Sequence, residues 1–226
     1  VSWAFARPFL KNQPNDPQNA PRLRDLFLFT VPLTIGGYFL SLSTILLAGI
    51  VARAPEPERM LPVYYLALGL ASPVAFAGTR MQTIVLAFPP ADRHRRETLR
   101  FAVVAGFLLG LLPLVFILPG PAEFYYIRLQ NLNPLDLEWV RQTAAVLVML
   151  PLAVALRAQS EGLATWRKQP LIVLAGHAVF LLAATATGIM ALSAGVPGCL
   201  IGAASLPLGS LASSATMRLA LRTNKT

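Results

Sequence analysis

The chain has 226 residues, of which 55% are hydrophobic and 13% charged, and its mean hydropathy is +0.60. A soluble domain carries about 25% charged residues, so this composition excludes an ordinary soluble protein and indicates an integral membrane protein. The net charge of +9 does not indicate nucleic-acid binding, because basic residues in membrane proteins set orientation and contact lipid. The bilayer with its anionic headgroups is therefore an expected partner, and nucleic acid is not.

Residues 1–22 are expected to form a cytoplasmic linker. The stretch KNQPNDPQNAPR has prolines at 14, 17 and 21, which block a regular helix, and it has nothing apolar to bury. The preceding VSWAFARPFL is either a frayed terminus or the end of an earlier helix. Because the sequence starts at Val1 and shows no cleavable leader, we expect a processed chain or a part of a longer one.

Residues 23–226 contain the runs that predict six transmembrane helices. The first helix is expected at about 26–52, where 27 residues without a charge are enough to cross a bilayer with some tilt. Pro32 and the Gly36-Gly37 pair inside it are typical of a bent helix that a neighbour approaches closely. Pro32 is therefore a candidate residue of a substrate cavity.

The second and third helices are expected at about 61–88 and 101–120. Arg80 lies in the cytoplasmic half of the second, and the basic loop ADRHRRETLR separates the two. The aromatic and acidic connection EFYYIRLQNLNPLDLE follows the third. Its Tyr125 and Tyr126 are typical of residues that lie along the membrane surface.

The fourth helix, at about 139–165, has a tryptophan near each end. Trp139 and Trp166 are 27 residues apart, which on a helix is about 40 Å, the thickness of a bilayer with its headgroup regions. Tryptophan prefers that interface. The segment therefore predicts a crossing.

The next 49 residues, 169–217, contain no Asp, Glu, Lys or Arg and are too long for one crossing. The only strong turn signal in them is Gly195-Val196-Pro197-Gly198. It predicts a fifth helix at about 170–193 and a sixth at about 197–221.

Positive charges gather on one side of this arrangement. The proposed cytoplasmic side carries Arg7, Lys11, Arg22, Arg24, Arg93, Arg95, Arg96, Arg100, Arg157, Arg167, Lys168, Arg218, Arg222 and Lys225, and the outer side Arg53, Arg59, Arg128 and Arg141. Because basic residues are retained inside, both termini are predicted to be cytoplasmic. The fold class is an all-α bundle of six transmembrane helices, expected in a bacterial cytoplasmic membrane.

Little in the sequence indicates catalysis. It has no GxGxxG or Walker motif, and its two histidines, at 94 and 177, lie far apart in depth. The single cysteine, Cys199, excludes an intramolecular disulfide and a thiolate metal site. None of the ten carboxylates falls at mid-membrane, so no proton or sodium relay is expected. We expect neither an enzyme nor a cofactor or metal.

Arg80 and His177 are the polar candidates for a substrate cavity. A charge in hydrocarbon costs roughly 2.5–3.5 kcal/mol and usually faces a cavity or a partner, although Arg80 can alternatively snorkel to the headgroups. For His177, a neutral interhelical hydrogen bond is favoured over a cavity role. Arg157 and Glu161 are one helical turn apart and are expected to pair.

Small residues mark one face of the sixth helix. Gly202, Ser205, Gly209 and Ser213 recur at intervals of three or four and therefore share that face. Small residues let helix backbones approach in lipid, so this face is predicted to meet another helix closely.

Two segments resemble the multidrug/oligosaccharidyl-lipid/polysaccharide flippase superfamily. Residues 156–184, LRAQSEGLATWRKQPLIVLAGHAVFLLAA, resemble its passage from the fourth to the fifth helix, and residues 29–52, FTVPLTIGGYFLSLSTILLAGIVA, resemble the start of a lobe. The likeness is closest to MATE-like and progressive-ankylosis-like transporters and covers most of 23–222 by helix order. It implies the C-terminal one of two six-helix lobes. The coupling carboxylates of many such transporters have no match here.

Two functions remain open. The resemblance implies a transporter lobe that moves an amphipathic or anionic solute by alternating access, together with a second homologous lobe. In that case Arg80 is expected to face the central cavity, because the second helix of a lobe lines it in the resembled family. The alternative is a structural transmembrane subunit packed against other membrane subunits, with Arg80 reaching headgroups or a partner carboxylate.

Overall fold

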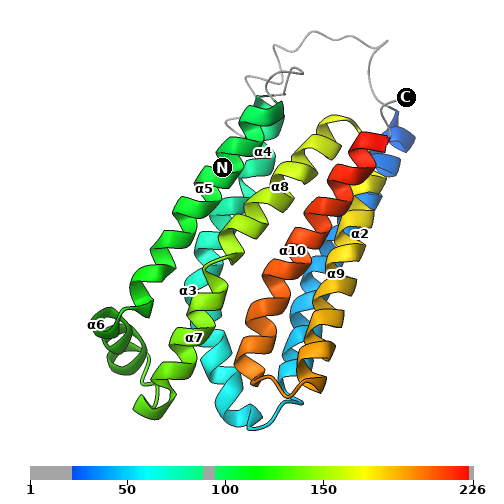
Figure 1. The fold of residues 1–226 in the computed structure, drawn as a ribbon. Coiled ribbons are helices and arrows are strands. Elements are labelled where there is room, and N and C mark those ends of the chain that lie inside the picture. The colour runs from blue at the N-terminus through cyan, green and yellow to red at the C-terminus, as the bar shows by residue number, and fades with distance from the viewer. Residues whose placement is uncertain (1–21, 89–94, 224–226) are drawn as a thin grey trace, which may run out of the picture.

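The computed structural model describes residues 22–88 and 95–223. Within these ranges the chain forms helices joined by turns, without a strand, and six crossings are long and apolar enough to span a membrane. Figure 1 shows the long helices side by side in one bundle. The prediction of a six-helix all-α membrane bundle is confirmed. Residues 1–21 of the predicted linker, and His94, lie outside the described residues.

The first half of the chain forms three crossings. The first is α2 (Leu23–Val51), and the second consists of α3 (Pro57–Thr79) and α4 (Met81–Ala87). The third is α5 (Arg95–Leu114), which continues as a 3-10 turn over Val115–Ile117.

The second half begins with short elements: α6 (Pro119–Ala122), a π-helical turn (Glu123–Leu129) and a 3-10 turn (Pro134–Asp136). Three more crossings follow, formed by α7 (Leu137–Leu147) with α8 (Leu150–Trp166), by α9 (Pro170–Ser193) and by α10 (Gly198–Thr223). The bounds of α9 agree with the prediction. The turn after it uses Gly195 at φ +72°, a left-handed conformation that glycine adopts without steric cost.

Two crossings contain a local break. Between α7 and α8, Pro151 has no N–H to offer the carbonyl of Leu147, so the regular helical hydrogen bonding is interrupted there. Between α3 and α4, the Arg80 N–H bonds to the carbonyl of Ala77 at 3.1 Å, three residues back, which is a 3-10 type turn.

The central element is α8, which contacts α3, α4, α5, α9 and α10. Figure 1 shows α3, α4 and α5 on one side of it and α10, α9 and α2 on the other. Glycines allow the close approach of α5: a Cβ on Gly106 would lie 2.7 Å from Leu152 Cα, and one on Gly110 would lie 2.6 Å from the Val148 carbonyl oxygen. By contrast α2 packs on α9 and meets α3 only sparsely.

The bundle has two electrostatically different ends. At the basic end, α2, α5 and α9 begin and α4, α8 and α10 finish (Figure 1). The described basic residues at or near this end are Arg22, Arg24, Arg95, Arg96, Arg100, Arg167, Lys168, Arg218 and Arg222, whereas the opposite end has Arg53, Arg59, Arg128 and Arg141. Apart from Arg157, the described members of the two predicted charge groups lie at the two ends of one bundle. The side of the membrane that each end faces stays a prediction.

The connection between α5 and α7 packs into the bundle. Tyr126 has no exposed surface and lies in an apolar cluster with Val140 and Ala144, its ring 5.0 Å from that of Tyr125. Burial raises the pKa of the Tyr126 hydroxyl, because it disfavours the charged form. The expectation that Tyr126 lies along the membrane surface is wrong, since the π-helical turn places its ring in the core.

Candidate functional site

A charged cluster is buried between α8 and α9. Arg157 donates from Nη1 to Glu161 Oε1 over 3.1 Å, and His177 Nε2 lies 2.8 Å from the same oxygen. The exposed fractions of these residues are 7%, 8% and 5% respectively. The predicted pair of Arg157 and Glu161 is confirmed, and so is the interhelical hydrogen bond expected for His177.

Helix geometry brings the three residues together. Arg157 and Glu161 share a face of α8 because they are four residues apart. Glu161 lies five residues before the end of α8, and His177 lies seven residues after the start of α9. The short turn between the two antiparallel helices therefore places the carboxylate and the imidazole at similar depth.

The other nitrogen of His177 faces α2. Nδ1 is buried and has no hydrogen-bond partner among the described residues. A Cβ on Gly36 would lie 2.5 Å from this atom, so only glycine lets α2 come this close. The neutral tautomer protonated on Nε2 donates to Glu161 and leaves only a lone pair at Nδ1, whereas an imidazolium would bury an unpaired N–H. With an ionised Glu161 and the cationic Arg157, the cluster is then neutral overall.

Arg157 retains unused hydrogen-bonding capacity. Its Cζ lies 5.3 Å from the centroid of the Phe180 ring, within cation–π range. Its Nε is buried and has no partner among the described residues. A guanidinium presents five N–H donors in a planar fork, so this side chain can bind a further acceptor.

A groove of about 350 Å³, here called the Arg157 groove, opens beside this cluster. Its walls come from α2, α3, α8, α9 and α10, and its lining residues are Leu40, Ser43, Thr44, Leu68, Ser72, Ala75, Phe76, Thr79, Leu150, Val154, Arg157, Phe180, Leu206 and Ser210. Among these described lining residues Arg157 alone is charged, while five contribute hydroxyl groups. Apolar walls with one cation and a few hydroxyls suit a ligand that has an anionic group and an apolar body.

A second polar network adjoins the cluster on the side of the basic end. The hydroxyls of Ser160 and Ser214 lie 3.0 Å apart, and Arg218 donates over 3.1 Å both to Ser160 Oγ and to Gln159 Oε1. Gln159 in turn donates to Thr98 Oγ1 over 3.3 Å. The network joins α5, α8 and α10.

The three candidate cavity residues lie outside the lining of the Arg157 groove. Arg80 is exposed at the break between α3 and α4, with its Cζ 5.5 Å from the centroid of Phe76, and lines a separate groove beside α5. Pro32 is half-buried within α2. His177 is next to the groove but reaches Arg157 only through Glu161.

The four small residues of α10 are all buried. They meet two different neighbours. A Cβ on Gly202 would lie 2.5 Å from the ring of Tyr64 on α3, whereas one on Gly209 would lie 3.0 Å from the carbonyl oxygen of Phe180 on α9. Ser205 bonds to the carbonyl of Ile201 in its own helix, and the Ser213 hydroxyl has no partner among the described residues.

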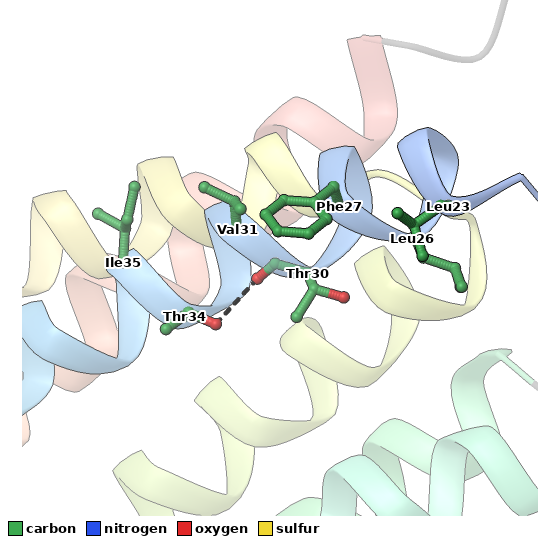
Figure 2. Close-up of a pocket in the computed structure, with 7 residues that line it drawn as sticks. All are labelled: Leu23, Leu26, Phe27, Thr30, Val31, Thr34 and Ile35. Carbon is green, nitrogen blue, oxygen red and sulfur yellow. Dashed lines mark hydrogen bonds between the residues drawn. The ribbon is translucent and has the colours of Figure 1, made fainter.

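A different depression runs along the outer face of α2 (Figure 2). Its lining residues all belong to this one helix, from Leu23 to Ile35, and the hydrogen bond from Thr34 Oγ1 to the Thr30 carbonyl oxygen, 3.1 Å long, is internal to it. A surface formed by one helix and without a charge has nothing to orient a ligand. It has the character of a lipid-facing surface, so the Arg157 groove is the better candidate site.

Sequence reasoning predicted the pair of Arg157 and Glu161 but did not place it at a candidate cavity, and it missed Phe180 as part of the site. It counted Arg157 among the charges of the cytoplasmic side, whereas the structure places this residue inside the bundle. The available signal was the composition of α8, in which nearly all residues around the charged pair except Gln159 are small or apolar. A helix that is apolar all round is a buried one, and a charge pair on it is buried with it.

Comparisons with known proteins give no relative. No family model, no curated protein and no solved structure matches this chain. Its own residues show the architecture of a multi-pass integral membrane protein, with a buried arginine–glutamate–histidine cluster beside a groove.

Proposed function

We propose that this chain is one six-helix lobe of a membrane transporter of the flippase-superfamily type. It binds an anionic or amphipathic solute in the Arg157 groove and moves it by alternating access. The observation that carries the proposal is a buried arginine in the wall of a groove that lies within the membrane-spanning helices. Charged residues at such positions are costly and mark solute pathways in membrane proteins.

The chemistry of Arg157 supports an anionic ligand. Its guanidinium is permanently charged and fits a carboxylate or a phosphate in bidentate geometry. Glu161 offsets the charge of Arg157 when the groove is empty, and the solute would compete with Glu161 for the same donors. The ring of Phe180 and the leucines of the walls would take the apolar part of the solute.

The open shape of the groove supports a role for a second lobe. Because α2 and α3 meet only sparsely, the described residues do not form a complete wall for the groove between them. A second homologous lobe would supply that wall, and residues 1–22 would connect the two. Under this proposal the basic end faces the cytoplasm of a bacterial cell, as the distribution of basic residues favours.

The test uses an alkyl phosphate as a probe for an anionic amphipathic ligand. Thermal unfolding of the purified full-length gene product is measured with dodecyl phosphate and, separately, with dodecyltrimethylammonium. A ligand that binds only the folded state raises the unfolding temperature. We expect stabilisation by the phosphate over the ammonium compound, and movement of the phosphate across proteoliposome membranes.

The matched variant removes the cation without leaving a buried charge. Arg157→Met combined with Glu161→Gln keeps the cluster neutral, so the fold is expected to persist while the preference for the phosphate is lost. Arg141→Met, at the opposite end, serves as the control for a general loss of positive charge. An equal phosphate effect in the double variant and the wild type would contradict the proposal.

A structural subunit is the second candidate function, and the internal pairing of the cluster favours it. Arg157 and His177 both donate to Glu161, so the three can serve purely as a clamp between α8 and α9. In that case the double variant would bind the probe as the wild type does. The native protein would also purify from its membrane with other subunits in fixed stoichiometry.

A further inference from the structure

A second groove lies on the other side of α3, between the α3–α4 crossing and α5, with a volume of about 440 Å³. Its α5 wall includes Phe101, Ala105, Leu108 and Leu112, and α8 contributes Ala155. Met81 and Ile84 of α4 line the same groove, and α3 contacts α5. The groove is apolar apart from Arg80, and it faces outward, away from the Arg157 groove.

Arg80 is a cation without a carboxylate partner among the described residues. It is exposed, and its Cζ lies over the ring of Phe76, 5.5 Å from the ring centroid. From Arg80 to the end of α4 is seven residues, or about 10 Å of helix. The long side chain can extend the guanidinium toward the lipid headgroups at this end.

We propose that this groove binds one anionic phospholipid, with its phosphate on Arg80 and an acyl chain along α5. The lining residues of α5 run from Phe101 to Leu112, about 16 Å along the helix, which is half of a hydrocarbon layer about 30 Å thick. The groove thus matches the depth of one leaflet. A guanidinium without an internal counter-charge complements a lipid phosphate, which it can bind in bidentate geometry.

The headgroup charge distinguishes the expected lipid. A zwitterionic lipid brings its own cation, which competes with Arg80 for the phosphate, whereas phosphatidylglycerol does not. The basic end adds to this preference, because Arg100 and the other arginines there attract anionic lipid to the same surface. This inference is independent of the proposed transport function, since it uses neither Arg157 nor the groove beside it.

The experiment counts bound lipids on the full chain by native mass spectrometry. The purified protein is given equal amounts of phosphatidylglycerol and phosphatidylcholine with identical acyl chains. We expect one phosphatidylglycerol to be retained in preference to phosphatidylcholine. Arg80→Gln is expected to lower that retention about fivefold, the effect of one arginine near an anionic membrane surface.

Three further variants and a competitor make the outcome decisive. Arg100→Gln removes the same charge at the same end but outside the groove, and retention is expected to fall much less than in Arg80→Gln. Ala105→Leu fills the groove without changing charge and is expected to reduce retention, and Arg80→Lys is expected to keep most of it. If Arg80→Gln does not fold, these last two variants carry the test, and full retention in Ala105→Leu overturns the proposal.

Other results also count against the lipid site. Equal retention of the two lipids by the wild type, or equal losses in Arg80→Gln and Arg100→Gln, would show general adsorption to the basic end. Displacement of the lipid by inorganic phosphate alone would show a site for a free anion. Either result would overturn the assignment of the groove to an anionic phospholipid.

Discussion

Glu161 Oε1 accepts hydrogen bonds from side chains of two helices. This one carboxylate oxygen therefore neutralises Arg157 on α8 and also links α8 to α9 through His177. Removing it leaves the Arg157 cation buried without a counter-charge. Glu161→Ala is therefore expected to destabilise the protein by roughly 3–5 kcal/mol, the cost of breaking a buried ion pair on one side. Unfolding by a denaturing detergent measures this, with the exposed Glu138→Ala as the control. Equal stability of the two variants would contradict a buried pair.

Gly36 and Gly37 form a matched pair for testing the environment of His177. A Cβ on Gly36 would lie 2.5 Å from His177 Nδ1, whereas one on Gly37 would have no atom within 4 Å. Gly36→Ala is expected to displace the imidazole and destabilise the protein by about 1–3 kcal/mol, as overpacking does. Gly37→Ala is expected to be neutral or slightly stabilising, because alanine favours the helix. Thermal unfolding of both variants decides whether α2 and α9 meet as described.

At the residue scale, local contacts were predictable and long-range ones were not. The pairing of Arg157 with Glu161 follows from a spacing of four residues on one helix, which the sequence displays directly. The bond from His177 to Glu161 depends on how α9 turns back after Trp166. The contact of Gly36 with His177 depends on which face of α2 meets α9. Neither of these rotations can be read from residue spacing, so the centre of the site was missed.

For a single helix, Gly209 tests whether small residues set the packing of α10. Its Cβ position lies 3.0 Å from the backbone carbonyl oxygen of Phe180, which cannot move aside as a flexible side chain would. Gly209→Leu is expected to push α10 away from α9 and to lower the unfolding temperature strongly. Gly49→Leu, where a Cβ would meet nothing within 4 Å, is expected to have little effect. Comparable losses in both variants would show that this contact does not hold the helices together.

The extent of each helix was easier to predict than its shape. The Gly195–Gly198 turn predicted where α9 ends, because it acts through local backbone conformation. The break before Pro151 is also local, yet an apolar run conceals it. The burial of Tyr126 is a tertiary effect: the π-helical turn turns the ring toward Val140 and Ala144, against the usual preference of tyrosine for an interface.

At the scale of the whole molecule, the direction of insertion is open to a direct test. Gln130→Cys lies at the opposite end and Thr223→Cys at the basic end, and both positions are exposed. The native Cys199 is buried and gives little background. If basic residues are retained inside, an impermeant thiol reagent applied to intact cells should label Gln130→Cys and not Thr223→Cys. Labelling of both variants from the same side would contradict the six-crossing topology.

The two proposed functions belong to different grooves: solute binding to the Arg157 groove and lipid binding to the groove that Arg80 lines. The six-helix architecture was predictable because charge-free runs and loop charges follow from the physics of the bilayer alone. The sequence did not reveal that Arg157 and Arg80 line two different grooves on opposite sides of α3. That arrangement depends on how the α3–α4 crossing is rotated in the bundle. Arg80 lines a groove beside α5 that is separate from the Arg157 groove, and its place at a central cavity of a two-lobe transporter stays a prediction.

The burial of α8 has a consequence for biosynthesis. This segment enters the membrane before α9 and α10 have been made, and its arginine and glutamate would each oppose insertion by about 2.5–3.5 kcal/mol if they stood alone. Because they pair within one helix, the segment carries its own counter-charge during translation. An isolated 134–168 segment should insert into microsomes more efficiently than its Glu161→Ala variant, as glycosylation mapping would show. The ion pair of Arg157 and Glu161 would then help α8 pass from the translocon into the membrane before the bundle has formed.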